Sequence, residues 1–125
     1  MDMKLELVPI PVSDVDRAKA FYVEQVGFHL DHDVEPGNGM RVVQLTPPGS
    51  ACSILIGTGI DGLTDRQPGI IKGLHLVVTD IVNVREALAG RGVEVSAIED
   101  MGGMKFVYFS DPDGNSWVLQ EMPGQ

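Results

Sequence analysis

The sequence predicts an α+β domain built from two copies of one βαβββ unit. Three short segments recur in the same order, 65 or 66 residues apart: Val12-Ser13-Asp14 with Val78-Thr79-Asp80, Gly27-Phe28 with Gly92-Val93, and Pro47-Pro48-Gly49 with Pro112-Asp113-Gly114. An internal repeat constrains the architecture before any single motif does. A chain of 125 residues is long enough for one domain made of two such units.

The first copy begins with a strand and a helix. Residues 7–12 alternate between two sets of side chains, and one set is entirely apolar, as in a strand with one buried face. Ser13 is followed by a helix expected near residues 14–26, with Ser13 and Asp16 resembling a capping box. Gly27 ends this helix, because glycine readily adopts the left-handed conformation after a last turn. Three strands should follow, near residues 28–34, 40–46 and 51–56.

The second copy has the same order of elements. A strand over 74–78 leads into a helix near residues 81–91, which Gly92 ends. Three more strands should follow, near residues 93–98, 104–110 and 116–121. The stretch between the copies is rich in glycine and contains Pro68, as expected of a linker. The expected boundaries are about 4–57 for module 1, 58–72 for the linker and about 73–122 for module 2.

Composition excludes several functions. Asp and Glu outnumber Lys and Arg by 18 to 9, giving a net charge of −9. We therefore expect no nucleic-acid partner, because phosphate binding needs clustered basic residues. No apolar run approaches the roughly 20 residues of a membrane span, and the first residues lack a signal peptide's apolar core. Cys52 is the one cysteine, which rules out an intrachain disulfide. These features favour a cytoplasmic protein without membrane partners.

The motifs of both copies together resemble a known family. They are Val12-Ser13-Asp14-Val15 with Ala20-Phe21-Tyr22 and Gly27-Phe28, then Gly73-Leu74-His75-Leu76-Val77-Val78-Thr79-Asp80, and Phe109-Ser110-Asp111-Pro112-Asp113-Gly114-Asn115 before Trp117. With these segments the sequence resembles the vicinal oxygen chelate superfamily, the glyoxalase, bleomycin-resistance and dioxygenase group. The resemblance implies a curved, cup-like mixed sheet with helices outside, a small-molecule cavity, and paired modules within one chain or across a homodimer.

The resemblance also implies where a metal would lie. Members typically hold a divalent ion with His, Glu or Gln at four cavity positions, which correspond here to Leu7, Ser53, Gly73 and Val118. Three of these residues lack donor atoms, and serine is a poor ligand compared with carboxylate or imidazole. His29 and His32 do not replace them, because residues three apart on a regular strand point to opposite faces. We therefore expect neither a metal nor another cofactor.

Strand alternation selects the residues that would line the cavity. His75 lies two residues after Gly73 and shares its face, and Tyr108 matches a substrate-contacting tyrosine of fosfomycin-resistance members. Mapping the strand of Tyr108 onto the first copy puts Arg41 in the cavity and Gln44 behind it, a register that one β-bulge would reverse. The predicted ligand-binding residues are Leu7, Pro9, Arg41, Ser53, Gly73, His75, Phe106, Tyr108, Val118 and Gln120.

Three functions are compatible with this cavity. The first is a metal-free module that binds an antibiotic or metabolite in an apolar cup, oriented by His75, Tyr108 and Gln120. The second is a lyase or isomerase in which His75 or Tyr108 transfers a proton. The third is a metal enzyme with displaced ligands such as His75 and Gln120. A Ser-His-Asp triad has no support, since no Gly-x-Ser-x-Gly sequence occurs.

Overall fold

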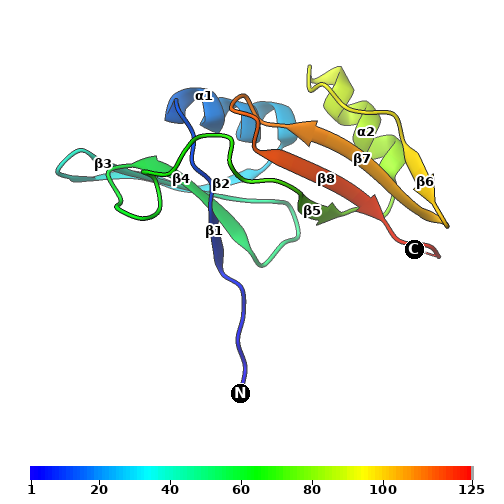
Figure 1. The fold of residues 1–125 in the computed structure, drawn as a ribbon, viewed down its shortest axis with the longest axis horizontal. Helices are drawn as coiled ribbons and strands as arrows, with labels where there is room; N and C mark the ends of the chain where they lie inside the picture. The colour runs from blue at the N-terminus through cyan, green and yellow to red at the C-terminus, as the bar shows by residue number, and fades with distance from the viewer. Residues whose placement is uncertain (125) are drawn as a thin grey trace.

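The computed structural model describes residues 1–124 and contains two four-stranded sheets (Figure 1). The first has the order β1-β4-β3-β2, formed by β1 (Leu7–Pro9), β2 (His29–Gly37), β3 (Met40–Thr46) and β4 (Ser53–Thr58). The second has the order β5-β8-β7-β6, formed by β5 (Leu74–Val77), β6 (Glu99–Met101), β7 (Met104–Ser110) and β8 (Ser116–Glu121). The β1–β4 and β5–β8 pairs are parallel, and the other pairs are antiparallel. The α+β fold with two βαβββ modules is confirmed.

The helices lie close to their predicted positions. Helix α1 (Val15–Ala20) continues into the π-helical segment η1 (Phe21–Val26), and α2 spans Ile81–Gly90. Asp14 and Asp80 cap the two helices, each accepting a hydrogen bond from a first-turn amide. Gly27 ends η1 with φ of 94°, a left-handed conformation that glycine adopts without steric cost.

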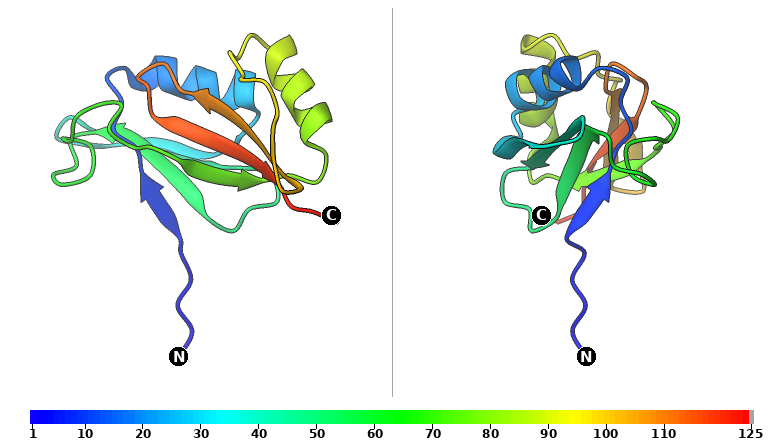
Figure 2. Two further views of the ribbon diagram at one scale, coloured as in Figure 1. Left: turned by 45° about the vertical axis from the view of Figure 1, so that its right-hand side comes forward. Right: turned by 90° about the vertical axis from the view of Figure 1, so that its left-hand side faces the viewer.

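Both modules share one core. The helices lie on the same side of the two sheets (Figures 1 and 2), so each sheet keeps one open face away from them. Aromatic rings join the modules in the buried core. Phe28 of module 1 packs on Trp117 of module 2 with ring centroids 5.5 Å apart, and Tyr22 packs on the same indole at 5.8 Å. Phe109 stacks on Trp117 from the neighbouring strand. Trp117 is therefore the centre of the packing between modules.

A buried hydrogen-bond network reinforces this contact. The carboxylate of Asp111, in the β7–β8 turn, accepts hydrogen bonds from the Tyr22 hydroxyl at 2.8 Å and from the Asn115 side chain and amide. The Asn115 amide group also donates to the carbonyl of Pro11 in module 1. Burial, and then the charge of Asp111, raises the pKa of Tyr22, so its hydroxyl stays protonated and donates. The Asp111–Asn115 turn thus ties module 2 to module 1.

One predicted strand is absent. Residues 93–98 were expected to form a strand, whereas the described strand in this region is β6, over Glu99–Met101. The segment does run beside β7, because the Ser96 amide donates to the Tyr108 carbonyl. The Tyr108 amide, however, donates to the Ser96 hydroxyl oxygen instead of a backbone carbonyl. A side chain that replaces the backbone acceptor interrupts the ladder.

The N-terminal residues leave the body of the protein. Residues 1–6 extend away from β1 in all views (Figures 1 and 2), and Met1, Met3 and Leu5 are exposed. These three side chains alternate with Asp2, Lys4 and Glu6, the pattern of a strand with one apolar face. None of the helices within residues 1–124 is long and apolar enough to cross a membrane.

Candidate functional site

The open face of module 2 gathers most of the predicted site. Tyr108 lies opposite Val118, and Val118 lies opposite His75, so these side chains form one row across β7, β8 and β5. The adjacent row contains Phe106 and Gln120. Residues between these positions, such as Val107 and Trp117, are buried in the core, which establishes the face of each row. The structure therefore brings His75, Phe106, Tyr108, Val118 and Gln120 together.

His75 and Tyr108 carry polar atoms on either side of the apolar Val118. The His75 Nδ1 atom lies 2.7 Å from the carbonyl oxygen of Gly73, so Nδ1 carries the hydrogen and Nε2 of the neutral ring is an acceptor. Tyr108 hydrogen-bonds to Glu99, and this bond raises the pKa of the phenol. Tyr108 is therefore protonated at neutral pH. Val118 between them is only 6% exposed.

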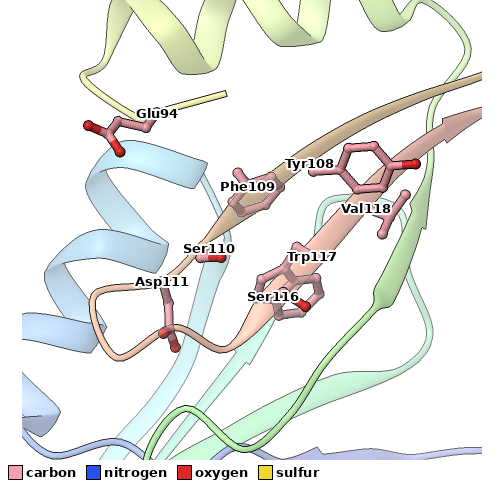
Figure 3. A pocket seen from close by; sticks show the side chains of 8 residues that line it. All are labelled: Glu94, Tyr108, Phe109, Ser110, Asp111, Ser116, Trp117 and Val118. Carbon is pink, nitrogen blue, oxygen red and sulfur yellow. The ribbon is translucent and has the colours of Figure 1, made fainter. Parts of the chain in front are cut away.

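A cavity of about 360 Å³ lies beside the Tyr108 end of this row and extends along β7 and β8 toward the turn between them (Figure 3). Tyr108 and Val118 line it together with the indole of Trp117. The remaining lining residues are Glu94, Phe109, Ser110, Asp111 and Ser116. Its volume lies in the range of small-molecule sites, and its lining mixes aromatic surface with a few polar groups.

A second, larger hollow of about 650 Å³ lies between the modules. It is bounded by β5, by Phe28 just after η1, by α2, and by the β3–β4 loop over residues 47–50. His75 lines this hollow, so the predicted residues are divided between two cavities. Sequence reasoning missed Phe28 and the loop, because only packing between the modules brings them beside β5.

The open face of module 1 holds the predicted residues Leu7, Pro9 and Ser53. Leu7 lies opposite Ser53, and Pro9 lies opposite Leu55. Ser53 is 5% exposed. The two sheets share no strand pairing within residues 1–124, so Leu7 and Ser53 belong to one half of the predicted site, and His75 and Val118 to the other.

Arg41 does not lie on this open face. Val43 and Leu45, on the same side of β3, are fully buried under the helices. The Arg41 guanidinium donates to Asp33 through two nitrogens, and to Asp16 at the start of α1. These hydrogen bonds from Arg41, and a further one from Lys19, hold the pKa of Asp33 well below its usual range. The placement of Arg41 in the cavity and of Gln44 behind it was wrong, because the register of β3 puts Arg41 on the side of Val43 and Leu45 and puts Gln44 on the open face beside Ser53.

A β-bulge changes the reading of the histidines as well. His29 lies opposite Thr46, while His32 lies opposite Gln44, and the pairing shifts between them. Because Thr46 and Gln44 share the open face, both histidines lie on it, with Asp31 at the bulge between them. The prediction that these histidines point to opposite faces was wrong. The sequence did signal Gln44 and Thr46, through the alternation of apolar and polar residues over 43–46.

The family's four metal positions are not equivalent in the two sheets. Leu7 lies opposite Ser53, but the residue opposite Val118 is His75, two positions after Gly73. The Gly73 amide instead donates to the Ser116 hydroxyl. Within residues 1–124, no group of three or more His, Cys, Asp or Glu side chains is arranged to hold a metal. Among the four positions only Ser53 has a side-chain oxygen, and that oxygen already takes part in hydrogen bonds with Gln44 and Thr46.

Comparison with known proteins found relatives in sequence and in structure. In sequence, the chain is 27% identical to the uncharacterised protein YetH of Bacillus subtilis (strain 168), over 97% of this chain and all of that one. In structure, it is similar to TnmS3, an antibiotic binding protein from Streptomyces sp. CB03234, with 35% identity, a TM-score of 0.83 and 97% of each chain covered. It is also similar to a superfamily member from Sphaerobacter thermophilus DSM 20745, with 33% identity, a TM-score of 0.80, and 96% and 98% coverage.

The family itself follows from a match that spans nearly the whole chain. The family model of the Glyoxalase/Bleomycin resistance protein/Dioxygenase superfamily matches residues 4–119, which include both modules and the linker. The two βαβββ modules and their shared helix layer are the architecture expected of such a match. The chain therefore belongs to the Glyoxalase/Bleomycin resistance protein/Dioxygenase superfamily.

Proposed function

We propose that this protein binds a small, largely apolar molecule on the open face of module 2, without a metal ion. The observation that carries the proposal is the row of Tyr108, Val118 and His75, in which an apolar centre is flanked by a phenol hydroxyl and an imidazole acceptor. This row adjoins the cavity that the Trp117 indole lines. The likeness to TnmS3, described as an antibiotic binding protein, supports a ligand of that general kind.

The residues at the family's metal positions favour binding over metal chemistry. Leu7, Gly73 and Val118 offer no ligand atoms, and apolar side chains would instead contact the ligand directly. Buried apolar area contributes roughly 25 cal/mol per Å² to binding, so such a site gains affinity mainly from contact. The polar groups at its edge would set the ligand's orientation.

Catalysis by His75 or Tyr108 is the alternative. The acceptor Nε2 of His75 could take a proton from a substrate, since Nδ1 is bonded to the Gly73 carbonyl. Tyr108 is a poor candidate for the base, because its raised pKa keeps it protonated. Loss of turnover in Tyr108→Phe with unchanged ligand affinity would favour catalysis and contradict a purely binding role.

Substitutions in the row test the binding proposal. A ligand taken from a screen of aromatic and polycyclic compounds should quench Trp117, the single tryptophan of the chain. Val118→Glu combined with Gly73→His should abolish this binding, because a charge would occupy the apolar centre. Tyr108→Phe should weaken binding only several-fold, since one hydrogen bond contributes about 1 kcal/mol. Stoichiometric zinc, nickel, manganese or iron in the purified protein would contradict the metal-free site.

A homodimer is part of the proposal. Met1, Met3 and Leu5 are exposed on the projecting N-terminal segment, and Val77 on the edge strand β5 is 67% exposed. Apolar surface gathered at unpaired strand edges is typical of a protein–protein contact. We expect light scattering at micromolar concentration to give twice the chain mass of 13.5 kDa. A mass near that of one chain would contradict the dimer.

The cytoplasmic location stays a prediction.

A further inference from the structure

The open face of module 1 carries a polar cluster built around the bulge residue Asp31. Asp31 Oδ2 accepts hydrogen bonds from the Thr46 hydroxyl and, at 3.4 Å, from the Gln44 amide group. The same two side chains reach Ser53: the hydroxyl oxygens of Thr46 and Ser53 are 2.6 Å apart, and Gln44 Nε2 lies 3.3 Å from Ser53. We call Asp31, Gln44, Thr46 and Ser53 the Asp31 cluster.

The hydrogen bonds of the Asp31 cluster leave acceptors available. Oδ2 of Asp31 is occupied, whereas the nearest basic side chain to Oδ1 within residues 1–124 is the His29 ring, whose Nε2 lies 3.8 Å away, beyond hydrogen-bond distance. Gln44 donates from its Nε2 to Asp31 and Ser53, and its carbonyl oxygen accepts no hydrogen bond from the described residues. The donors on one side hold the carboxylate in place, and its second oxygen stays open. Such fixed acceptors lower the ordering cost of binding.

Asp33 on the same strand provides a contrast to Asp31. Asp33, two residues later and on the opposite face, is paired with both Arg41 and Lys19 at 2.8 Å. Asp31 has only 24% of its side chain exposed, yet no Lys or Arg in the described chain lies within 4 Å of it. A half-buried carboxylate attracts a cation more strongly than a fully hydrated one, because water screens it less.

The surroundings define the kind of cation. Leu7 is opposite Ser53, and Leu55 is opposite Gln44, so apolar side chains border the Asp31 cluster on the same face. An acceptor-only carboxylate beside apolar surface suits a molecule that joins a protonated amine to a ring system. The net charge of −9 also favours the approach of a cation.

We propose that the Asp31 cluster binds the protonated amine of an otherwise apolar aromatic ligand. This inference rests on the proposed function in part, because both assume that the protein binds an aromatic small molecule. The two remain separable, since a neutral aromatic compound reports on apolar binding alone and its cationic counterpart reports on Asp31. The Asp31 cluster lies on module 1 and shares no side chain with the row on module 2.

The matched probes are 9-aminoacridine, a cation at neutral pH, and acridine, which is neutral there. Titrations of the full-length protein, followed by fluorescence anisotropy, should show 9-aminoacridine bound roughly tenfold or more tightly than acridine, as expected for a charge-assisted hydrogen bond. Asp31→Asn should remove this preference without changing the affinity for acridine. The control Asp61→Asn makes the same charge change in the exposed linker and should retain the preference.

Each other outcome has a defined meaning. Equal affinities for the two probes in the unsubstituted protein, or a preference that survives Asp31→Asn, would overturn the inference while leaving apolar binding intact. Binding of 9-aminoacridine alone, lost in Asp31→Asn, would support the inference and count against apolar binding. Failure of both probes to bind contradicts both. If Asp31→Asn lowers the melting temperature, Gln44→Leu provides a second measurement, and it should reduce the preference several-fold.

Discussion

Replacing Asp111 with alanine should lower the free energy of unfolding by about 3–5 kcal/mol, because several buried donors lose their acceptor together. The carboxylate accepts from the Tyr22 hydroxyl, from the backbone amides of Asp113 and Asn115, and from the Asn115 side chain. Asp111 is 5% exposed and Asn115 is fully buried, so water cannot easily take its place. The network joins the modules, and the loss should therefore affect the whole domain.

Urea unfolding monitored by Trp117 fluorescence measures the effect of Asp111→Ala. The control Asp61→Ala removes a carboxylate from the exposed linker and should change the free energy of unfolding by less than about 0.5 kcal/mol. Tyr22→Phe removes the hydrogen bond from the Tyr22 hydroxyl to Asp111 and leaves the other donors to Asp111 paired. It should therefore lower the free energy of unfolding by less than Asp111→Ala does. Equal stability of Asp111→Ala and Asp61→Ala would show that the turn does not hold the modules together.

Trp117→Ala should also cost about 3–5 kcal/mol, the range for removing a large buried aromatic side chain. The indole is 3% exposed and contacts rings from both modules, namely Tyr22, Phe28 and Phe109. Its Nε1–H also donates to the Tyr22 hydroxyl at 3.0 Å. The cavity left behind would lie between the modules, where neither sheet can close over it without moving the other.

Thermal unfolding followed by circular dichroism measures this effect, since the variant has no tryptophan. We expect the melting temperature to fall by roughly 10–20 °C. Trp117→Phe is the matched control: it keeps a ring in contact with Phe28 but loses the hydrogen bond to Tyr22, so its loss should be clearly smaller. A melting temperature of Trp117→Ala within a few degrees of the unsubstituted protein would contradict the central role of the indole.

Most of the fold could be predicted from local patterns. Alternation places β3 and β7 within the expected ranges, since Val43 and Leu45, and Val107 and Phe109, are buried on one face of their strands. Gly27 and Gly92 mark the helix ends, because both adopt positive φ values. The same alternation wrongly predicted a strand over residues 93–98. The Ser96 hydroxyl there accepts a hydrogen bond in place of a backbone carbonyl, and alternation in the sequence does not reveal such a contact.

The candidate site was predictable on one module and not on the other. In module 2 the offset from Val118 to Tyr108 places both residues in one row, and β7 and β8 pair without a bulge. In module 1 the bulge at Asp31 brings His29 and His32 onto one face, and the register of β3 places Arg41 on the side of the helices. A register change of one residue exchanges the two faces of a strand. Bulges depend on the neighbouring strand and therefore leave little trace in a single sequence.

The sequence by itself determined the two βαβββ modules, their helices and the absence of ligand atoms at Leu7, Gly73 and Val118, since these follow from periodicity and residue chemistry. Tertiary structure alone decided that Trp117 and Asp111 join the modules, that His75 rather than Gly73 lies opposite Val118, and that the Asp31 cluster forms. The physical reason is the distance along the sequence over which each kind of signal acts. Periodicity reflects burial within one element, whereas these contacts depend on strand register and on side chains that meet from positions up to about 100 residues apart.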